Sequence, residues 1–99
     1  MSEGHTLIIP KRHVASWFEV SDREREDLFA LLARAKTGLD QQTQPDAYNI
    51  GINDGKAAGQ TVAHLHIHLI PRYDQDVEDP RGGVRWVKPD QAVYWTDKQ

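Results

Sequence analysis

The stretch Thr61-Val-Ala-His-Leu-His-Ile-His-Leu-Ile-Pro71 places a histidine at every second position. The three histidines are His64, His66 and His68, and leucine and isoleucine separate them. Along a β-strand, residues two apart point to one face and their neighbours point to the other. The alternation therefore predicts a strand, ended by the proline, with three imidazoles on one face and an apolar row on the buried face.

The composition is that of one small domain. The chain has 99 residues, of which 38% are hydrophobic, a formal net charge of −3 and no cysteine. The negative charge argues against a nucleic-acid surface, and the lack of cysteine excludes disulfides and thiolate metal sites. There is no apolar run of the roughly 20 residues that span a membrane, and the first residues lack the features of a signal peptide. We expect a cytoplasmic protein with neither nucleic acid nor membrane as partner.

The domain is predicted to cover residues 1–99, with a core over about 4–72 and an extended tail over about 73–99. The tail begins with an acidic stretch and continues with Pro80-Arg-Gly-Gly83, which has little to hold it in regular structure. Its later apolar residues are expected to dock onto the body of the protein or onto a partner chain. A lean core also favours an assembly over an isolated monomer.

One long helix is predicted over about residues 22–42. Ser21 followed by Glu24 is a capping-box signature, and acidic residues gather in the first turn. Apolar residues then recur at helical spacing; these are Leu28, Leu31, Leu32, Ala35 and Leu39. Two further strands are predicted over residues 5–9 and 47–53. A loop with two glycines joins the second of these to the histidine run, which predicts an antiparallel hairpin.

Three aligned histidines allow three interpretations. A purely structural role is usual for one surface histidine but a poor explanation for three in register. A metal site is possible, since three imidazoles plus water is a catalytic zinc arrangement. The outer two Cα atoms would lie roughly 13 Å apart along a strand, however, which is wide for one ion. The third interpretation is nucleophilic catalysis, in which a histidine attacks phosphorus and neighbouring rings donate to the phosphate.

The loop ahead of the strand favours the nucleophilic interpretation. Gly55 and Gly59 allow backbone amides to approach an anion closely, and Gln60 and Thr61 add side-chain donors. The central histidine, His66, has an imidazole on either side and is the natural attacker.

These motifs resemble those of the histidine triad family. The resemblance rests on His64-Leu-His-Ile-His-Leu-Ile70 together with Gly59-Gln-Thr61, and extends over His5–His13, the helix and Asn49–Gly55. The segment Pro80-Arg-Gly-Gly-Val-Arg-Trp86 is similar to that of bacterial members in the branch that includes dinucleoside polyphosphate hydrolases. Family members usually carry a further segment ahead of the counterpart of Gly4, which forms much of the nucleoside pocket. We expect the chain to be shortened at this end.

The resemblance implies an α+β fold with an antiparallel sheet, one main helix and a homodimer. It also implies a nucleotide hydrolase or nucleotidyl transferase that acts at the α-phosphate of a nucleoside phosphoramidate or dinucleoside polyphosphate, without a metal or other cofactor. His66 would form a covalent nucleotidyl intermediate, and His64 and His68 would bond the phosphate and scissile oxygens. The substrate-binding positions would be Asn53, Gly59, Gln60, Thr61 and His13. The alternative is a non-catalytic nucleotide-binding or interaction module with an incomplete nucleoside pocket.

Overall fold

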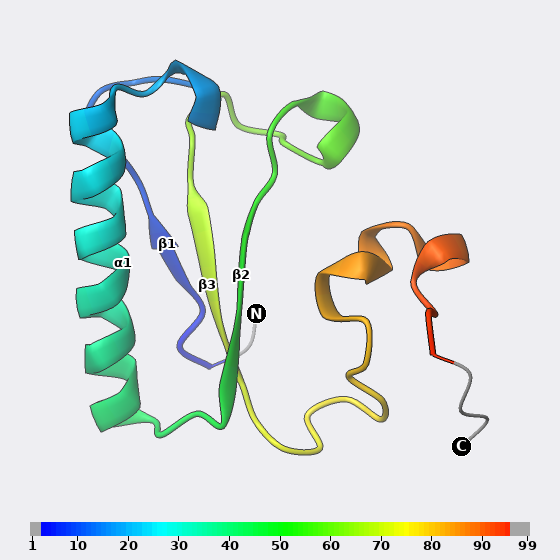
Figure 1. Ribbon diagram of the computed structural model, residues 1–99. Helices are drawn as coiled ribbons and strands as arrows, with labels where there is room; N and C mark the ends of the chain where they lie inside the picture. The colour runs from blue at the N-terminus through cyan, green and yellow to red at the C-terminus, as the bar shows by residue number, and fades with distance from the viewer. Residues whose placement is uncertain (1–2, 96–99) are drawn as a thin grey trace.

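The computed structural model describes residues 3–95, which form a three-stranded antiparallel sheet with one long helix packed against it (Figure 1). The elements, in chain order, are β1 (Thr6–Ile8), the 3-10 helix η1 (Trp17–Glu19), α1 (Asp22–Gln42), β2 (Ala47–Ile52), η2 (Lys56–Ala58), β3 (Ile67–Arg72), η3 (Gly83–Val87) and η4 (Pro89–Gln91). The strand order is β1-β3-β2, so the strand that follows the histidines is central. The α+β architecture predicted from the sequence is confirmed.

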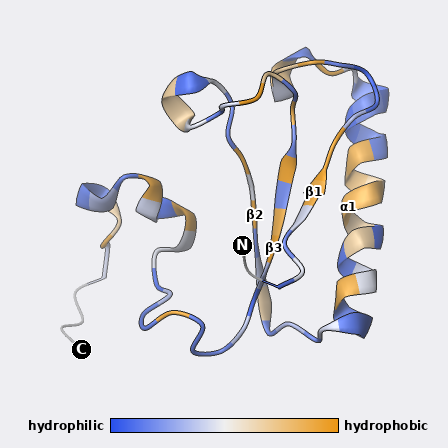
Figure 2. Ribbon diagram, turned by 180° about the vertical axis from the view of Figure 1, so that it is seen from behind, coloured by the Kyte–Doolittle hydropathy of each residue, from blue (hydrophilic) through white to orange (hydrophobic). Residues whose placement is uncertain are grey.

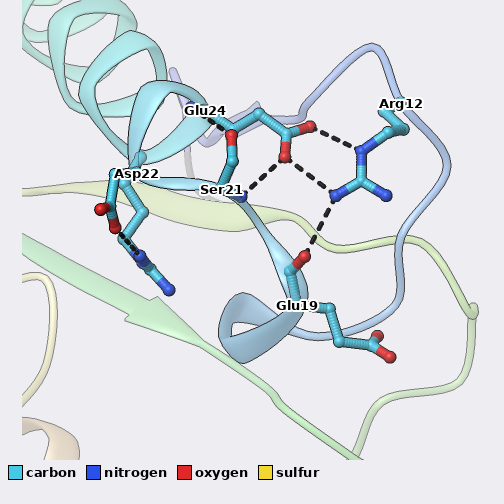
Figure 3. Close-up of polar contacts among 6 residues, drawn as sticks. Arg12, Glu19, Ser21, Asp22 and Glu24 are labelled. Carbon is cyan, nitrogen blue, oxygen red and sulfur yellow. Dashed lines mark hydrogen bonds and ion pairs between the residues drawn. The ribbon is translucent and has the colours of Figure 1, made fainter.

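Helix α1 begins and ends at the residues that its sequence predicts. The Ser21 side chain accepts from the Glu24 backbone N–H and the Glu24 carboxylate accepts from the Ser21 N–H, which completes the capping box. The same carboxylate binds the Arg12 guanidinium at 2.9 and 3.0 Å, and Arg12 also donates to the Glu19 carbonyl (Figure 3). These bonds hold the turn after β1 against the start of the helix. They also hold the pKa of Glu24 at about 2, chiefly through the hydrogen bond from Arg12.

The core lies between α1 and the sheet. Leu65 and Leu69 are fully buried, and buried residues alternate with half-buried ones along β3. The buried cluster comprises Ile8, Val14, Val20, Leu28, Leu65 and Ile67. Trp17 packs partly against this cluster, whereas Phe18 is exposed. The sequence alternation therefore predicted the buried face correctly.

The limits of the histidine strand differ from the prediction at both ends. Strand β3 begins at Ile67 rather than near Thr61, because the chain before it bonds elsewhere: the Leu65 N–H donates to the Val14 carbonyl at 2.7 Å. The strand also continues through Pro71 to Arg72.

Proline is tolerated inside β3 because its nitrogen faces a side with no strand to bond. The Arg72 carbonyl accepts from the Asp46 N–H on the β2 side, so the nitrogen of Pro71 faces the opposite side. There β1 has already ended, since its pairing stops at Thr6 opposite Leu69.

The tail folds mainly onto itself and lies on the other side of β2 from α1 (Figures 1 and 2). The Trp86 indole N–H donates to the Arg81 carbonyl at 2.7 Å, and the Arg85 guanidinium donates to the carbonyls of Gln91 and Ala92. The Arg85 guanidinium also stacks over the ring of Tyr94. None of the helices within residues 3–95 has the length and apolarity needed to cross a membrane.

Candidate active site

The three histidines lie on one face of the chain where it enters β3, opposite the buried leucines. Each side chain is half-buried, and the ring centroids of His66 and His68 are 4.9 Å apart. Only His68 belongs to the hydrogen-bonded strand, where it is paired with Gly51 of β2 and Leu7 of β1. Because Gly51 carries no side chain, the face beside His68 remains open on the β2 side, and a Cβ there would meet nothing within 4 Å.

The orientation of His66 is set by its own backbone neighbour. Its Nδ1 lies 3.0 Å from the carbonyl oxygen of His64. A carbonyl only accepts hydrogen bonds, so Nδ1 carries the proton and Nε2 of the neutral ring carries a free lone pair. The ring is thus held in the tautomer that a nucleophile requires.

The first histidine of the run is hydrogen-bonded to the segment that follows β1. The Nε2 atom of His64 lies 3.1 Å from the Pro10 carbonyl, and the same argument places the proton on that nitrogen. His13 stacks edge-on against His64 with the ring centroids 4.6 Å apart, so this further histidine of the predicted site lies beside the run.

The third histidine has a partner that sequence reasoning missed. His5 Nε2 lies 3.0 Å from His68 Nδ1, although the sequence suggested only a structural role for His5. Burial is the main cause that lowers the pKa of His68 below its usual 6.5, and the nearby His66 and His5 lower it further. The other nitrogen of His68, Nε2, is buried and has no hydrogen-bond partner in the structure. An unpaired buried polar atom of this kind is a place where a ligand atom can bind.

The side chain of Gln60 holds the glycine-containing loop in place. The Gln60 side chain accepts from the Gly55 N–H and donates to the Ala15 carbonyl, both at 2.8 Å. Its amide therefore shapes the loop, with the oxygen and one N–H of the side chain engaged in these bonds. Gly55 and Gly59 adopt φ values of 99° and 98°, which side-chain-bearing residues rarely adopt.

Two other predicted positions lie at the exposed edge of this loop. Asn53 follows β2, and its side-chain nitrogen would lie 3.9 Å from a Cβ placed on Gly59. Thr61 is exposed directly after the loop. Within residues 3–95, no three His, Cys, Asp or Glu side chains are placed so that they could hold a metal ion.

Known proteins are similar to this chain in both sequence and fold. The HIT domain family model matches residues 1–75. The chain is 40% identical over 76 residues to the asymmetrical bis(5'-nucleosyl)-tetraphosphatase of Schizosaccharomyces pombe, a match that covers 77% of this chain and 42% of that protein. It is 36% identical over 75 residues to the adenosine 5'-monophosphoramidase of the same organism, covering 76% and 53% respectively.

Among solved structures, a HIT family protein of Bacillus anthracis superposes with a TM-score of 0.71 at 28% identity, covering 99% of this chain and 60% of that one. The chain spans about half the length of several curated relatives that it matches. The alternating histidines, the fold around them and the family match over three quarters of the sequence lead to one conclusion: this chain belongs to the HIT family.

Proposed function

We propose that this protein cleaves a nucleotide at its α-phosphate through a covalent nucleotidyl-His66 intermediate. The observation that carries the proposal is the hydrogen bond from His66 Nδ1 to the His64 carbonyl, which leaves Nε2 with a lone pair available for attack. Two relatives support the reaction class by name, since one is a dinucleoside tetraphosphatase and the other a phosphoramidase.

The first half of the reaction forms one bond and breaks one bond. His66 Nε2 attacks the α-phosphorus, and the leaving atom departs with the electron pair of its bond to phosphorus. The leaving atom takes the proton from His68 Nε2, and the proton of His5 Nε2 crosses to His68 Nδ1. The His5–His68 pair begins this step with one positive charge and ends it neutral. Burial lowers the pKa of His68, so a charge on its own ring is disfavoured.

The second half of the reaction regenerates the free enzyme. A water molecule attacks the phosphorus, the bond to His66 Nε2 breaks, and one proton of the water returns to the histidine pair. If the acceptor is another nucleophile instead of water, the same site transfers the nucleotidyl group.

The remaining site residues are assigned by position. His64 and His68 border the attacked phosphate on either side of His66, and His13 stacks behind His64. We assign Asn53, Gly59 and Thr61 to phosphate contacts at the loop edge, and Gln60 to the same region through the loop that it braces. We further propose that the protein works in the cytoplasm as a homodimer and needs no cofactor.

Intact-mass spectrometry after brief mixing with an adenosine phosphoramidate, quenched at neutral or alkaline pH, tests the proposal. We expect an added adenylyl mass on the native chain and none on His66→Ala. His66→Asn should bind the nucleotide without an adduct, and a chelator should leave the reaction unchanged. Turnover by His66→Ala at the native rate would refute the role of His66. Tight nucleotide binding without adduct or product on the native chain would instead favour a binding module.

A further inference from the structure

A short segment between β1 and α1 contacts both parts of the candidate site, and we call residues 14–17 the support segment. Its Val14 carbonyl accepts from the Leu65 N–H, in the middle of the histidine run, at 2.7 Å. Its Ala15 carbonyl accepts from the Gln60 side chain, in the glycine-containing loop, at 2.8 Å. Val14 is itself buried in the core cluster. The histidine run and the loop are therefore held to one common, packed element.

The glycine-containing loop also closes on itself. The Gln60 N–H donates to the Gly55 carbonyl at 3.1 Å, and the Gly55 N–H donates to the Gln60 side chain at 2.8 Å. Within this closure lies η2, which Figures 1 and 2 show beyond the end of the sheet, at the same end as η1. Because the loop is closed internally, its position relative to His66 depends on the bonds that it makes to the rest of the chain.

Asp54, the residue just before this closure, makes two such bonds. Its Oδ2 atom accepts from the Ser16 hydroxyl and from the Trp17 N–H, each at 3.0 Å. The Ser16 hydroxyl in turn accepts from the Phe18 N–H and so caps η1. Hydrogen bonds to a carboxylate are roughly twice as strong as those between neutral groups. Asp54 thus ties the loop to the support segment at a second point, beside the bond from Gln60.

A carboxylate beside a phosphate-binding loop opposes the binding of an anion, because like charges repel. Asp54 directly follows Asn53, and the loop that begins here ends with Gly59 and Thr61, which we assign to phosphate contacts. The two hydrogen bonds from the support segment account for a carboxylate at this position, since a neutral side chain would bind the same donors less strongly. Removing the charge alone should therefore improve substrate binding while the loop is held less firmly.

We propose that Asp54 is a positioning residue, which holds the glycine-containing loop where its groups meet the phosphate in the transition state. The inference rests on the proposed function, because it concerns the same phosphate contacts. Asp54 acts through the support segment, which also carries the backbone bond to Leu65 inside the histidine run. A misplacement of about 1 Å at a reacting centre costs about 100-fold in rate, even when its cause lies away from the chemistry.

Single-turnover adduct formation with the adenosine phosphoramidate tests this role in Asp54→Ala and Asp54→Asn. Asp54→Ala should lower the limiting rate at saturating substrate about 10- to 100-fold, with the half-saturating concentration changed less than about threefold. Asp54→Asn should keep the rate within about tenfold of native, because its amide oxygen accepts from the same two donors, and should saturate at an equal or lower concentration.

Asp46→Ala is the matched control. The Asp46 carboxylate also accepts from a backbone N–H, that of Asp74 at 2.8 Å, but Asp46 precedes β2 whereas Asp54 follows it. The control should stay within about twofold of the native rate. Ser16→Ala removes one of the two donors to Asp54, so it should slow the reaction by itself but add about twofold or less to the loss in Asp54→Ala.

Hydrogen exchange of the loop amides gives a readout that does not need turnover. Asp54→Ala should speed exchange over residues 55–60 by about tenfold or more, and Asp46→Ala should leave it unchanged. A native limiting rate in Asp54→Ala, an equal loss of rate in the control, or unchanged loop exchange would overturn the inference while the native chain still forms the His66 adduct. Absence of adduct and product on the native chain would overturn the proposed function, and the exchange would still decide whether Asp54 holds the loop.

Discussion

Replacing His5 with phenylalanine tests the proton path of the site directly. Phenylalanine keeps an aromatic ring beside His68 but removes the nitrogen that lies 3.0 Å from His68 Nδ1. In the proposed mechanism two contributions are lost together: the hydrogen bond from His5 that sets the tautomer of His68, and the proton that restores His68 after the leaving atom has been protonated. His5→Gln is the matched variant, because its amide can still donate to His68 but cannot carry a titratable proton.

The expected loss follows from these two contributions. One hydrogen bond is worth about 1 to 1.5 kcal/mol net, which corresponds to about tenfold in rate. Proton transfer from a positioned group contributes about 100-fold or more, and His68 itself is retained, so part of that contribution survives. We therefore expect His5→Phe to lower kcat by about 10- to 100-fold with little change in KM. His5→Gln should fall between this variant and the native chain.

Single-turnover adduct formation between pH 5.5 and 8.5 separates the two contributions. On the native chain the rate should fall as the pH rises, because the His5–His68 pair loses the proton that the leaving atom needs. His5→Gln should move this falling limb to lower pH, since His68, whose pKa burial lowers, is then the one titrating group of the pair, and the loss of rate should be greater for an amine leaving group than for a polyphosphate. Native kcat in His5→Phe, or an unchanged falling limb in His5→Gln, would refute the proton path.

Two further predictions concern stability. Leu65→Ala removes a fully buried side chain between two site histidines, and should lower the free energy of unfolding by about 3 kcal/mol in urea denaturation; a loss below about 1 kcal/mol, as expected for the exposed Leu7→Ala control, would contradict the packing. The pKa of Glu24 is held at about 2 in the folded chain against an ordinary 4.5, so its stabilisation is present above about pH 4.5 and is lost as the pH falls toward 2. Glu24→Gln should lower Tm at pH 7 and flatten its decline below pH 4.5, whereas Glu26→Gln, an exposed neighbour, should change neither.

The parts of the fold that the sequence predicted best are those decided locally. The start of α1 follows from Ser21 and Glu24, three residues apart, whose reciprocal bonds form within one turn. The buried face of the histidine run follows from strict alternation, and Leu65, Ile67 and Leu69 are all in the core. Neither inference depends on contacts with distant parts of the chain.

The parts that the sequence did not predict depend on contacts between distant residues. His5 and His68 are 63 positions apart, and they meet because β1 and β3 pair with Leu7 opposite His68. This register places His5 diagonally across from His68 on the same face, within reach of its ring. The contact could have been predicted from the antiparallel pairing of β1 with β3. A sequence alone, however, does not show which strands are neighbours or in what register they pair.

The hydrogen-bonded part of the histidine strand begins only at Ile67, and this late start contributes to the site. A carbonyl of a central strand that faces a neighbouring strand accepts a ladder hydrogen bond from it. The His64 carbonyl lies outside the strand and accepts from His66 Nδ1. Had the strand begun near Thr61, as the alternation suggested, a backbone N–H of the neighbouring strand would have competed with His66 Nδ1 for that carbonyl. The alternating sequence places the three rings on one face, and the departure of the backbone from the sheet gives the middle ring the hydrogen bond that a nucleophile needs.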